Sequence, residues 1–291
     1  MKALVILNLS AGKGASDSVR EKIERQFAAA NIDYEVVETG KDAKPGDVVR
    51  ERMDEKFDLV VAAGGDGTVS EVFDALFGSS VPLGIVPTGT GNWIARELNI
   101  PTQIDDAIAL IVHEPRTMVI DAMRIGKRVY VLNAGVGINA VVAATPRESK
   151  KRFGLFAYVV TVFKTIRIRP RQLEVTADGT THTFRAVEVA ISNCGILAKK
   201  VYPNGPDIRV DDGHVDIWIL SMKTMLDYTR YLIGLLFGRR TKAQFLIARQ
   251  RVTITSKFPL IAQADGDVIG TTPIEAEILP GALRVLVPTQ S

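Results

Sequence analysis

The stretch VVAAGGDGTVSEVFDALFG, residues 60–78, decides how the first part of this chain is interpreted. Its apolar run ends at two glycines, and beyond a third glycine apolar residues recur every three or four positions. The first pattern is typical of a buried strand and the second of an amphipathic helix. A strand-to-helix turn has no need of an aspartate between Gly65 and Gly67, so Asp66 is a candidate for chemistry.

The same alternation fills the first 122 residues. Strand-like runs at 3–9, 34–39, 58–64 and 82–87 are each followed by a helical pattern. This order predicts an α/β domain with a parallel, doubly wound sheet. Ligands of such sheets bind at the carboxyl ends of the strands, and the three glycine-rich turns of this region are all expected there.

The pattern changes after residue 122. Short β-like segments separated by turn residues predict a mainly antiparallel β-sandwich, interrupted by helical character near 149–167 and 224–238. We therefore expect two domains, an α/β nucleotide-binding domain at 1–122 and a β-sandwich domain at 123–291.

Composition narrows the class of protein. The chain has 291 residues, of which 46% are hydrophobic and 24% charged, as in ordinary globular proteins. A single cysteine excludes an intrachain disulfide and fits a reducing compartment. The chain opens without a signal peptide and has no apolar run long enough to span a membrane, so we expect a cytoplasmic protein. A net charge of +3 does not argue for nucleic acid as a partner.

Glycine-rich turns at helix N-termini expose backbone N–H groups that bind phosphate. Three such turns at one sheet edge favour a nucleotide, although the glycines could also serve only to permit tight turns. The Walker motif is absent because Gly14 follows Lys13, and the dinucleotide fingerprint fails because Ile94 stands where its third glycine belongs.

Six segments, taken in order, resemble the diacylglycerol kinase catalytic-domain family, which includes bacterial lipid kinases and sphingosine kinases. They are NLSAGKG (8–14), GGDGTVSEV (64–72), PTGTGNWIAR (87–96), VIDAMRIGKRVYVLNAGVGINA (119–140), RVDDGHVDIWIL (209–220) and ADGDVIG (264–270). GGDGT is shared with NAD kinases and phosphofructokinases, so the specificity lies in the ordered set. The resemblance implies ATP- and Mg²⁺-dependent phosphorylation of diacylglycerol or a related lipid alcohol, as in phospholipid biosynthesis.

The resemblance also assigns residues. Those implied to line the ATP phosphates are Asn8, Ser10, Gly12, Thr39, Gly64, Gly65, Asp66, Gly67, Thr68, Glu71, Gly89, Thr90 and Asn92. Asp66 and Asp121 are implied to hold the catalytic Mg²⁺, and Asp66 suits that role because Mg²⁺ takes one or two carboxylates beside phosphate oxygens. A second, structural Mg²⁺ is implied at Arg209, Asp212 and His214. A plain acidic turn explains that stretch equally well.

The proton acceptor for the lipid hydroxyl is implied to be Asp265 or Asp267, and the sequence does not decide between them. Taken alone, their Asp-Gly turn reads as a solvated hairpin.

Four departures from the family pattern bear on function. Leu9 replaces a proline, Asp267 replaces the glutamate of the late motif, and ILAKKVY (196–202) replaces a run of glycines. Trp93 stands where an aspartate is common, which puts the usual metal network in doubt. The competing interpretations are an NAD kinase-like enzyme and a catalytically impaired, nucleotide-binding regulatory protein on the same fold.

A lipid substrate requires contact with a membrane. Residues 147–171 combine eight cations with apolar and aromatic residues, and residues 228–242 carry a similar mixture. This composition predicts peripheral contact with anionic lipid, or alternatively two amphipathic helices packed on the second domain. The sequence leaves open the lipid acceptor and the oligomeric state, for which a homodimer is one option.

Overall fold

The computed structural model describes residues 1–8, 13–40, 43–113, 115–144, 170–201, 205–221, 227 and 243–289. Ser10 and Gly12 of the predicted phosphate loop lie outside these ranges, as do residues 147–169 and 228–242 of the predicted membrane contact. The chain divides into two compact units. Unit 1 comprises residues 1–122, 128–131 and 280–291, and unit 2 comprises 123–127 and 132–279. Residues 280–291, assigned to the second domain from sequence, thus group with the first unit.

Unit 1 contains a parallel sheet in the order β2-β1-β3-β4-β16, and each of its neighbouring pairs is parallel. Its strands are β1 (Lys2–Asn8), β2 (Asp33–Thr39), β3 (Leu59–Gly64), β4 (Leu83–Pro87) and the end of β16 (Ile274–Val287), with β6 (Arg128–Tyr130) beside β5 (Arg116–Ile125). Its helices are α1 (Lys13–Ala29), α2 (Pro45–Arg52), the short 3₁₀ helix η2 (Met53–Glu55), α3 (Asp66–Leu76), α4 (Trp93–Glu97) and α5 (Ile104–Val112). The predicted parallel α/β sheet is confirmed.

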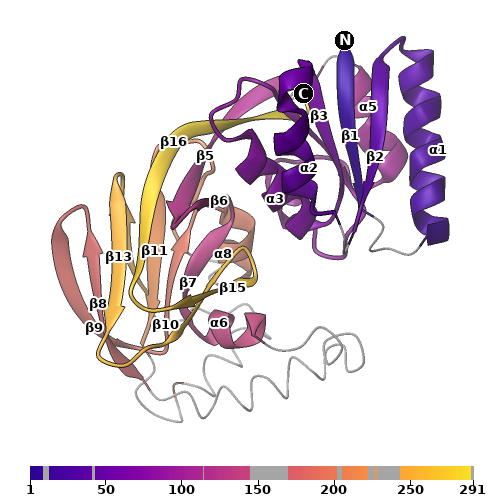
Figure 1. Cartoon of the computed structure of the whole chain (residues 1–291). Coiled ribbons are helices and arrows are strands. Elements are labelled where there is room, and N and C mark those ends of the chain that lie inside the picture. The colour runs from indigo at the N-terminus through magenta and orange to yellow at the C-terminus, as the bar shows by residue number, and fades with distance from the viewer. Residues whose placement is uncertain are drawn as a thin grey trace. The chain divides into compact units, whose positions relative to one another are not determined.

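Helices cover both faces of this sheet (Figure 1). Alternate residues of β1 and β3 point to opposite faces, as strand geometry requires. One set packs with Ile23 and Phe27 of α1 and Ile108 of α5 in a shared core. Helices α2 and α3 lie together against β1 and β3, where a side chain on Gly46 would lie 2.8 Å from the Glu71 carbonyl. The carboxyl ends of β1, β3 and β4 therefore meet at one edge of the sheet.

Unit 2 is built from two antiparallel sheets, as predicted. One has the order β12-β11-β10-β7-β14-β15 and the other joins the first part of β16 to β13, β8 and β9. Their strands are β7 (Asn133–Gly137), β8 (Arg171–Ala177), β9 (Thr180–Ala186), β10 (Glu188–Ser192), β11 (Val215–Leu220), β12 (Ala243–Ala248), β13 (Arg251–Ser256), β14 (Ile261–Ala264) and β15 (Asp267–Thr271). Helices α6 (Ile138–Ala143) and α8 (Gly195–Val201) complete the described part of this unit. Within the described ranges, no helix is long and apolar enough to cross a bilayer.

Candidate active site

The turns after β3 and β4 touch each other through their backbones. The amide of Thr88 donates to the carbonyl of Gly64 at 3.0 Å. A Cβ added to Gly89 would lie only 2.6 Å from the Cα of Gly65, so no side chain fits between the two turns. This contact explains why positions 65 and 89 are both glycine. It also brings two runs of backbone N–H groups to the same point of the sheet edge.

Asp66 is enclosed by the second of these turns. It is the first residue of α3, and its Oδ1 accepts the amide of Ile94 at 3.1 Å. Burial raises the pKa of Asp66, and hydrogen bonds from the amides of residues 92–94 oppose that increase. A Cβ on Gly91 would lie 2.9 Å from its Oδ2 and 2.8 Å from Nε1 of Trp93. The carboxylate therefore joins the start of α3 to the start of α4.

The end of β1 reaches the same place. Asn8 donates from Nδ2 to Oγ1 of Thr68 at 2.6 Å, which links the first loop to the GGDGT turn. Gly64 has no room for a side chain, because its Cβ would lie 2.5 Å from that threonine. The structure thus brings together the predicted residues Asn8, Gly64, Gly65, Asp66, Thr68 and Gly89.

Two other predicted phosphate ligands are engaged with the protein itself. Asn92 has a left-handed φ of 50°, and its side chain both accepts from the amide of Gly89 (3.0 Å) and donates to the carbonyl of Gly89 (2.8 Å). Thr39 is 1% exposed and donates to the carbonyl of Leu7 at 3.4 Å. In this structure both side chains brace the loops. Gly67 and Thr90 are exposed, and Glu71 is half-buried.

Sequence reasoning gave no role to Arg96, which contributes a positive charge beside these turns. It is exposed, and its Nε donates to the carbonyl of Gly91 at 3.0 Å. An arginine in the last turn of a short helix carries no signal that it folds back on the preceding loop. The contact becomes visible only in the structure.

The described acidic side chains near this edge do not by themselves form a metal cage. Within the described ranges, no three His, Cys, Asp or Glu side chains are grouped closely enough to hold a metal. Asp121 is 3% exposed, and its Oδ1 accepts the amide of Gly281 at 2.7 Å. Asp66 supplies a carboxylate among backbone donors, which suits an ion that keeps waters and phosphate oxygens in its shell.

In unit 2 the two aspartates of the late acidic motif differ. Asp265 has a left-handed φ of 46°, and its Oδ1 accepts the amides of Leu132 (2.9 Å) and Asn133 (3.1 Å). Asp267 is the first residue of β15 and is exposed. Asp265 therefore fixes the turn, whereas Asp267 stands at its surface.

Gln263 and Asn133 support this turn and were not singled out from the sequence. Gln263 is 2% exposed, donates to Oδ1 of Asn133 at 2.7 Å and accepts the amide of Gly266 at 3.0 Å. Asn133 pairs in register with Ser192 of β10, which pairs with Asp216 of β11. A row of polar residues thus crosses one end of this sheet.

The other end of that row reaches the predicted structural metal site. Nδ1 of His214 lies 3.0 Å from Oδ1 of Asp212, and its Nε2 lies 3.9 Å from Oδ2 of Asp216. Burial raises the pKa of Asp216, and His214 partly opposes this. Arg209 directs its guanidinium to Asp211 at 3.1 Å. The structure therefore brings Asp212 and His214 together, while a metal role for this group stays a prediction.

Comparison with known proteins covers both units. Residues 2–125 match the family model described as the diacylglycerol kinase catalytic domain. Residues 133–287 match the model described as the YegS C-terminal NAD kinase beta sandwich-like domain.

Three similar proteins illustrate the match. A protein named diacylglycerol kinase from Mycobacterium tuberculosis is 28% identical over 79% of this chain and 77% of its own length. One named "Probable lipid kinase YegS-like" from Pseudomonas aeruginosa is 29% identical over 100% of this chain and 96% of its own. A crystal structure of a diacylglycerol kinase from Bacillus anthracis superposes with a TM-score of 0.79 and 25% identity, covering 99% of this chain and 97% of that one.

Proposed function

Because this chain belongs to the family that joins a diacylglycerol kinase catalytic domain to a YegS C-terminal domain, we propose that it is an ATP-dependent lipid kinase. It transfers the γ-phosphoryl group of ATP to the hydroxyl of diacylglycerol or a related lipid alcohol. The observation that carries this proposal is the backbone contact between the Gly65 and Gly89 turns, with Asp66 beside them.

The turns serve to bind the nucleotide phosphates. Phosphoryl transfer depends mostly on positioning and on neutralising negative charge, and backbone N–H groups do both without rearranging. The amides that follow Gly65 and Gly89 supply such donors, and Arg96 adds a cation beside them. Asn92 and Thr39 act indirectly by holding the loops in shape.

Asp66 holds Mg²⁺, directly or through water, when the nucleotide binds. The ion supplies charge neutralisation for the phosphates. Trp93 occupies the neighbouring position at which relatives commonly carry a second acid. The bound ion would therefore have Asp66 as its carboxylate at this turn, without a second acid at position 93.

Asp267 takes the proton of the lipid hydroxyl. The oxygen of that hydroxyl attacks the γ-phosphorus, the bond from that phosphorus to the bridging oxygen breaks, and ADP leaves with the bonding electrons. Asp265 is the weaker candidate for the base because two backbone amides already share its Oδ1. Asp265 and Gln263 position the turn that carries Asp267.

Because its substrate lies in a bilayer, the enzyme contacts the membrane as a peripheral protein. We expect it to do so from the cytoplasm. Incubation with γ-labelled ATP, Mg²⁺ and a panel of diacylglycerol, monoacylglycerol and sphingoid lipids, with NAD as an additional acceptor, tests the proposal. Label in a lipid product supports it, whereas label only in NADP favours the NAD kinase-like alternative. ATP binding without transfer to any acceptor favours the regulatory alternative.

A further inference from the structure

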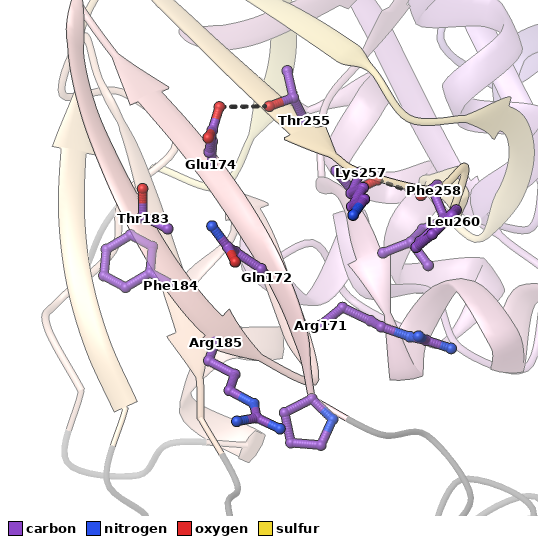
Figure 2. A pocket seen from close by; sticks show the side chains of 12 residues that line it. Arg171, Gln172, Glu174, Thr183, Phe184, Arg185, Thr255, Lys257, Phe258 and Leu260 are labelled. Carbon is purple, nitrogen blue, oxygen red and sulfur yellow. Dashed lines mark hydrogen bonds between the residues drawn. The ribbon is translucent and has the colours of Figure 1, made fainter.

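Unit 2 contains a concavity of about 930 Å³ that the candidate active site does not use (Figure 2). It lies over β8, β9, β13 and the turn that follows β13. Its lining residues are Pro170, Arg171, Gln172, Glu174, Thr183, Phe184, Arg185, Thr255, Ser256, Lys257, Phe258 and Leu260. Most of these residues are exposed, so the concavity is open to solvent.

Strand alternation explains why this face is polar. Leu173 and Val175 of β8 are buried in the sandwich, so Gln172 and Glu174 between and beside them project outward. Gln172 lies opposite Arg185 of β9 in the strand register. The concavity therefore takes in the solvent face of β8 and β9 at Gln172, Glu174, Thr183 and Arg185. No catalytic residue proposed above belongs to it.

The lining carries unbalanced positive charge. Arg171, Arg185 and Lys257 contribute three positive charges and Glu174 one negative charge, which leaves a net charge of +2. Throughout the described ranges, no acidic side chain forms an ion pair with any of these three cations. By contrast, Arg251 of the same unit forms an ion pair with Glu275 at 3.0 Å.

An exposed aromatic residue adjoins these cations. The side chain of Phe258 is 62% exposed, and Nζ of Lys257 lies 5.7 Å from the centre of its ring. The turn that carries it is braced, because the Ser256 hydroxyl donates to the Phe258 carbonyl at 2.7 Å and the Leu260 amide donates to the Thr272 hydroxyl at 3.0 Å. A fixed turn thus presents an aromatic ring to solvent, beside cations that form no ion pair with the acidic residues the structure describes.

We propose that this concavity is the face with which the protein docks on an anionic phospholipid surface. The three cations contact lipid phosphates, and Phe258 enters the interface, a combination typical of interfacial binding. The proposal rests on the proposed function, which requires the protein to collect its substrate from a bilayer. Arg171 is also the last cation of the basic segment identified in the sequence, residues 147–171.

Vesicle sedimentation without nucleotide tests the docking face. Wild type is expected to sediment with vesicles of phosphatidylglycerol and phosphatidylcholine and to bind pure phosphatidylcholine weakly. Each cation near an anionic surface strengthens partitioning about fivefold, so R171Q/R185Q/K257Q should lose about 100-fold in affinity. Phe258→Ser should lose several-fold at unchanged charge.

A matched control removes the same charge elsewhere. Lys56, Lys127 and Arg249 are exposed and lie outside the concavity, so K56Q/K127Q/R249Q should bind within about twofold of wild type. Melting temperatures of all variants check the fold, and Lys257→Gln alone replaces the triple variant if that variant melts early. Equal losses in both triple variants, or unchanged binding of the concavity variant, would overturn the proposal.

Two further arms separate the alternatives. Displacement of wild type from vesicles by millimolar inorganic phosphate, with no effect of Phe258→Ser, would show a site for soluble anions instead of a membrane face. Phosphorylation of a short-chain diacylglycerol in detergent micelles is measured separately. R171Q/R185Q/K257Q should retain this activity. If vesicle binding is normal but neither wild type nor any variant transfers phosphate to lipid, the proposed kinase activity is refuted. The proposed docking face would still be supported.

Discussion

Replacing Glu188 by glutamine should abolish a large pH dependence of the stability of unit 2. Glu188 begins β10 and is 1% exposed. Its Oε2 accepts the amide of Asn139 at 3.0 Å, whereas its Oε1 has no hydrogen-bond partner in the described part of the chain. Burial raises the pKa of Glu188 from 4.5 to about 8. The carboxyl group is therefore protonated in the folded protein at neutral pH and ionised in the unfolded chain.

The sign and size follow from linkage. Because the folded state binds the proton more tightly, its contribution is fully present below pH 4.5 and is lost as the pH rises towards 8. Each pH unit across that interval weakens the fold by about 1.4 kcal/mol, so the whole interval amounts to about 5 kcal/mol. Glutamine does not titrate, but its buried NH₂ group costs about 1 to 3 kcal/mol. Glu188→Gln should therefore be less stable than wild type at pH 5 and more stable at pH 8.5.

Urea unfolding between pH 5 and pH 9 measures this difference. The chain has two tryptophans, so Trp93→Phe leaves Trp218 of β11 as the fluorescent reporter of unit 2. The control in the same background is Glu174→Gln, which removes an exposed carboxylate from β8. Parallel pH curves for Glu188→Gln and the unmutated background would refute the reasoning, since they would show that Glu188 does not hold a proton in the fold.

Three further predictions concern catalysis. Asp66→Asn should abolish transfer while circular dichroism stays unchanged, because loss of the metal-binding carboxylate costs several kcal/mol in the transition state; wild-type turnover would remove Asp66 from the mechanism. Gly89→Ala should weaken ATP binding at least tenfold in calorimetry, since its Cβ would lie 2.6 Å from the backbone of Gly65. Asp267→Asn should lower kcat roughly 10²–10⁴-fold with little change in the KM for ATP. Asp265→Asn should chiefly lower the melting temperature, and the reverse pattern would exchange the two roles.

The sequence predicted the first unit well because its elements are local. Residues 58–64 and 68–78 appear as β3 and α3, with the helix beginning two residues early because Gly65 caps it. The turn and helix expected within 88–100 appear as a turn and the short helix α4, which begins directly after the left-handed Asn92. Helix α5 was missed altogether, although it shares the core with α1.

In the second unit, the sequence pattern did not show where a continuous β-like segment is divided between two sheets. One β-like segment was expected over 181–193, but the structure divides it into β9 and β10, which belong to different sheets. No glycine or proline marks the break at Val187, so the alternation reads as continuous. Similarly, the segment 128–137 is divided between β6 and β7, which lie in different units.

The candidate site was predictable in its residue types but not in its partnerships. The glycines and Asp66 could be named because a tight strand-to-helix turn favours glycine and has no need of an aspartate. The different environments of Asp265 and Asp267 depend on Leu132 and Asn133, more than 130 residues earlier in the chain. Such contacts leave no mark on local sequence, which is why the sequence left the base undecided.

Strand β16 limits the order in which the two units can fold during synthesis. Its residues from 280 onward complete unit 1, where Val285 pairs with Leu83 and Leu286 enters the core. A ribosome makes those residues only after the whole of unit 2 has been translated. Unit 1 therefore cannot complete this edge of its sheet until the rest of the chain, which is more than half of it, has been synthesised.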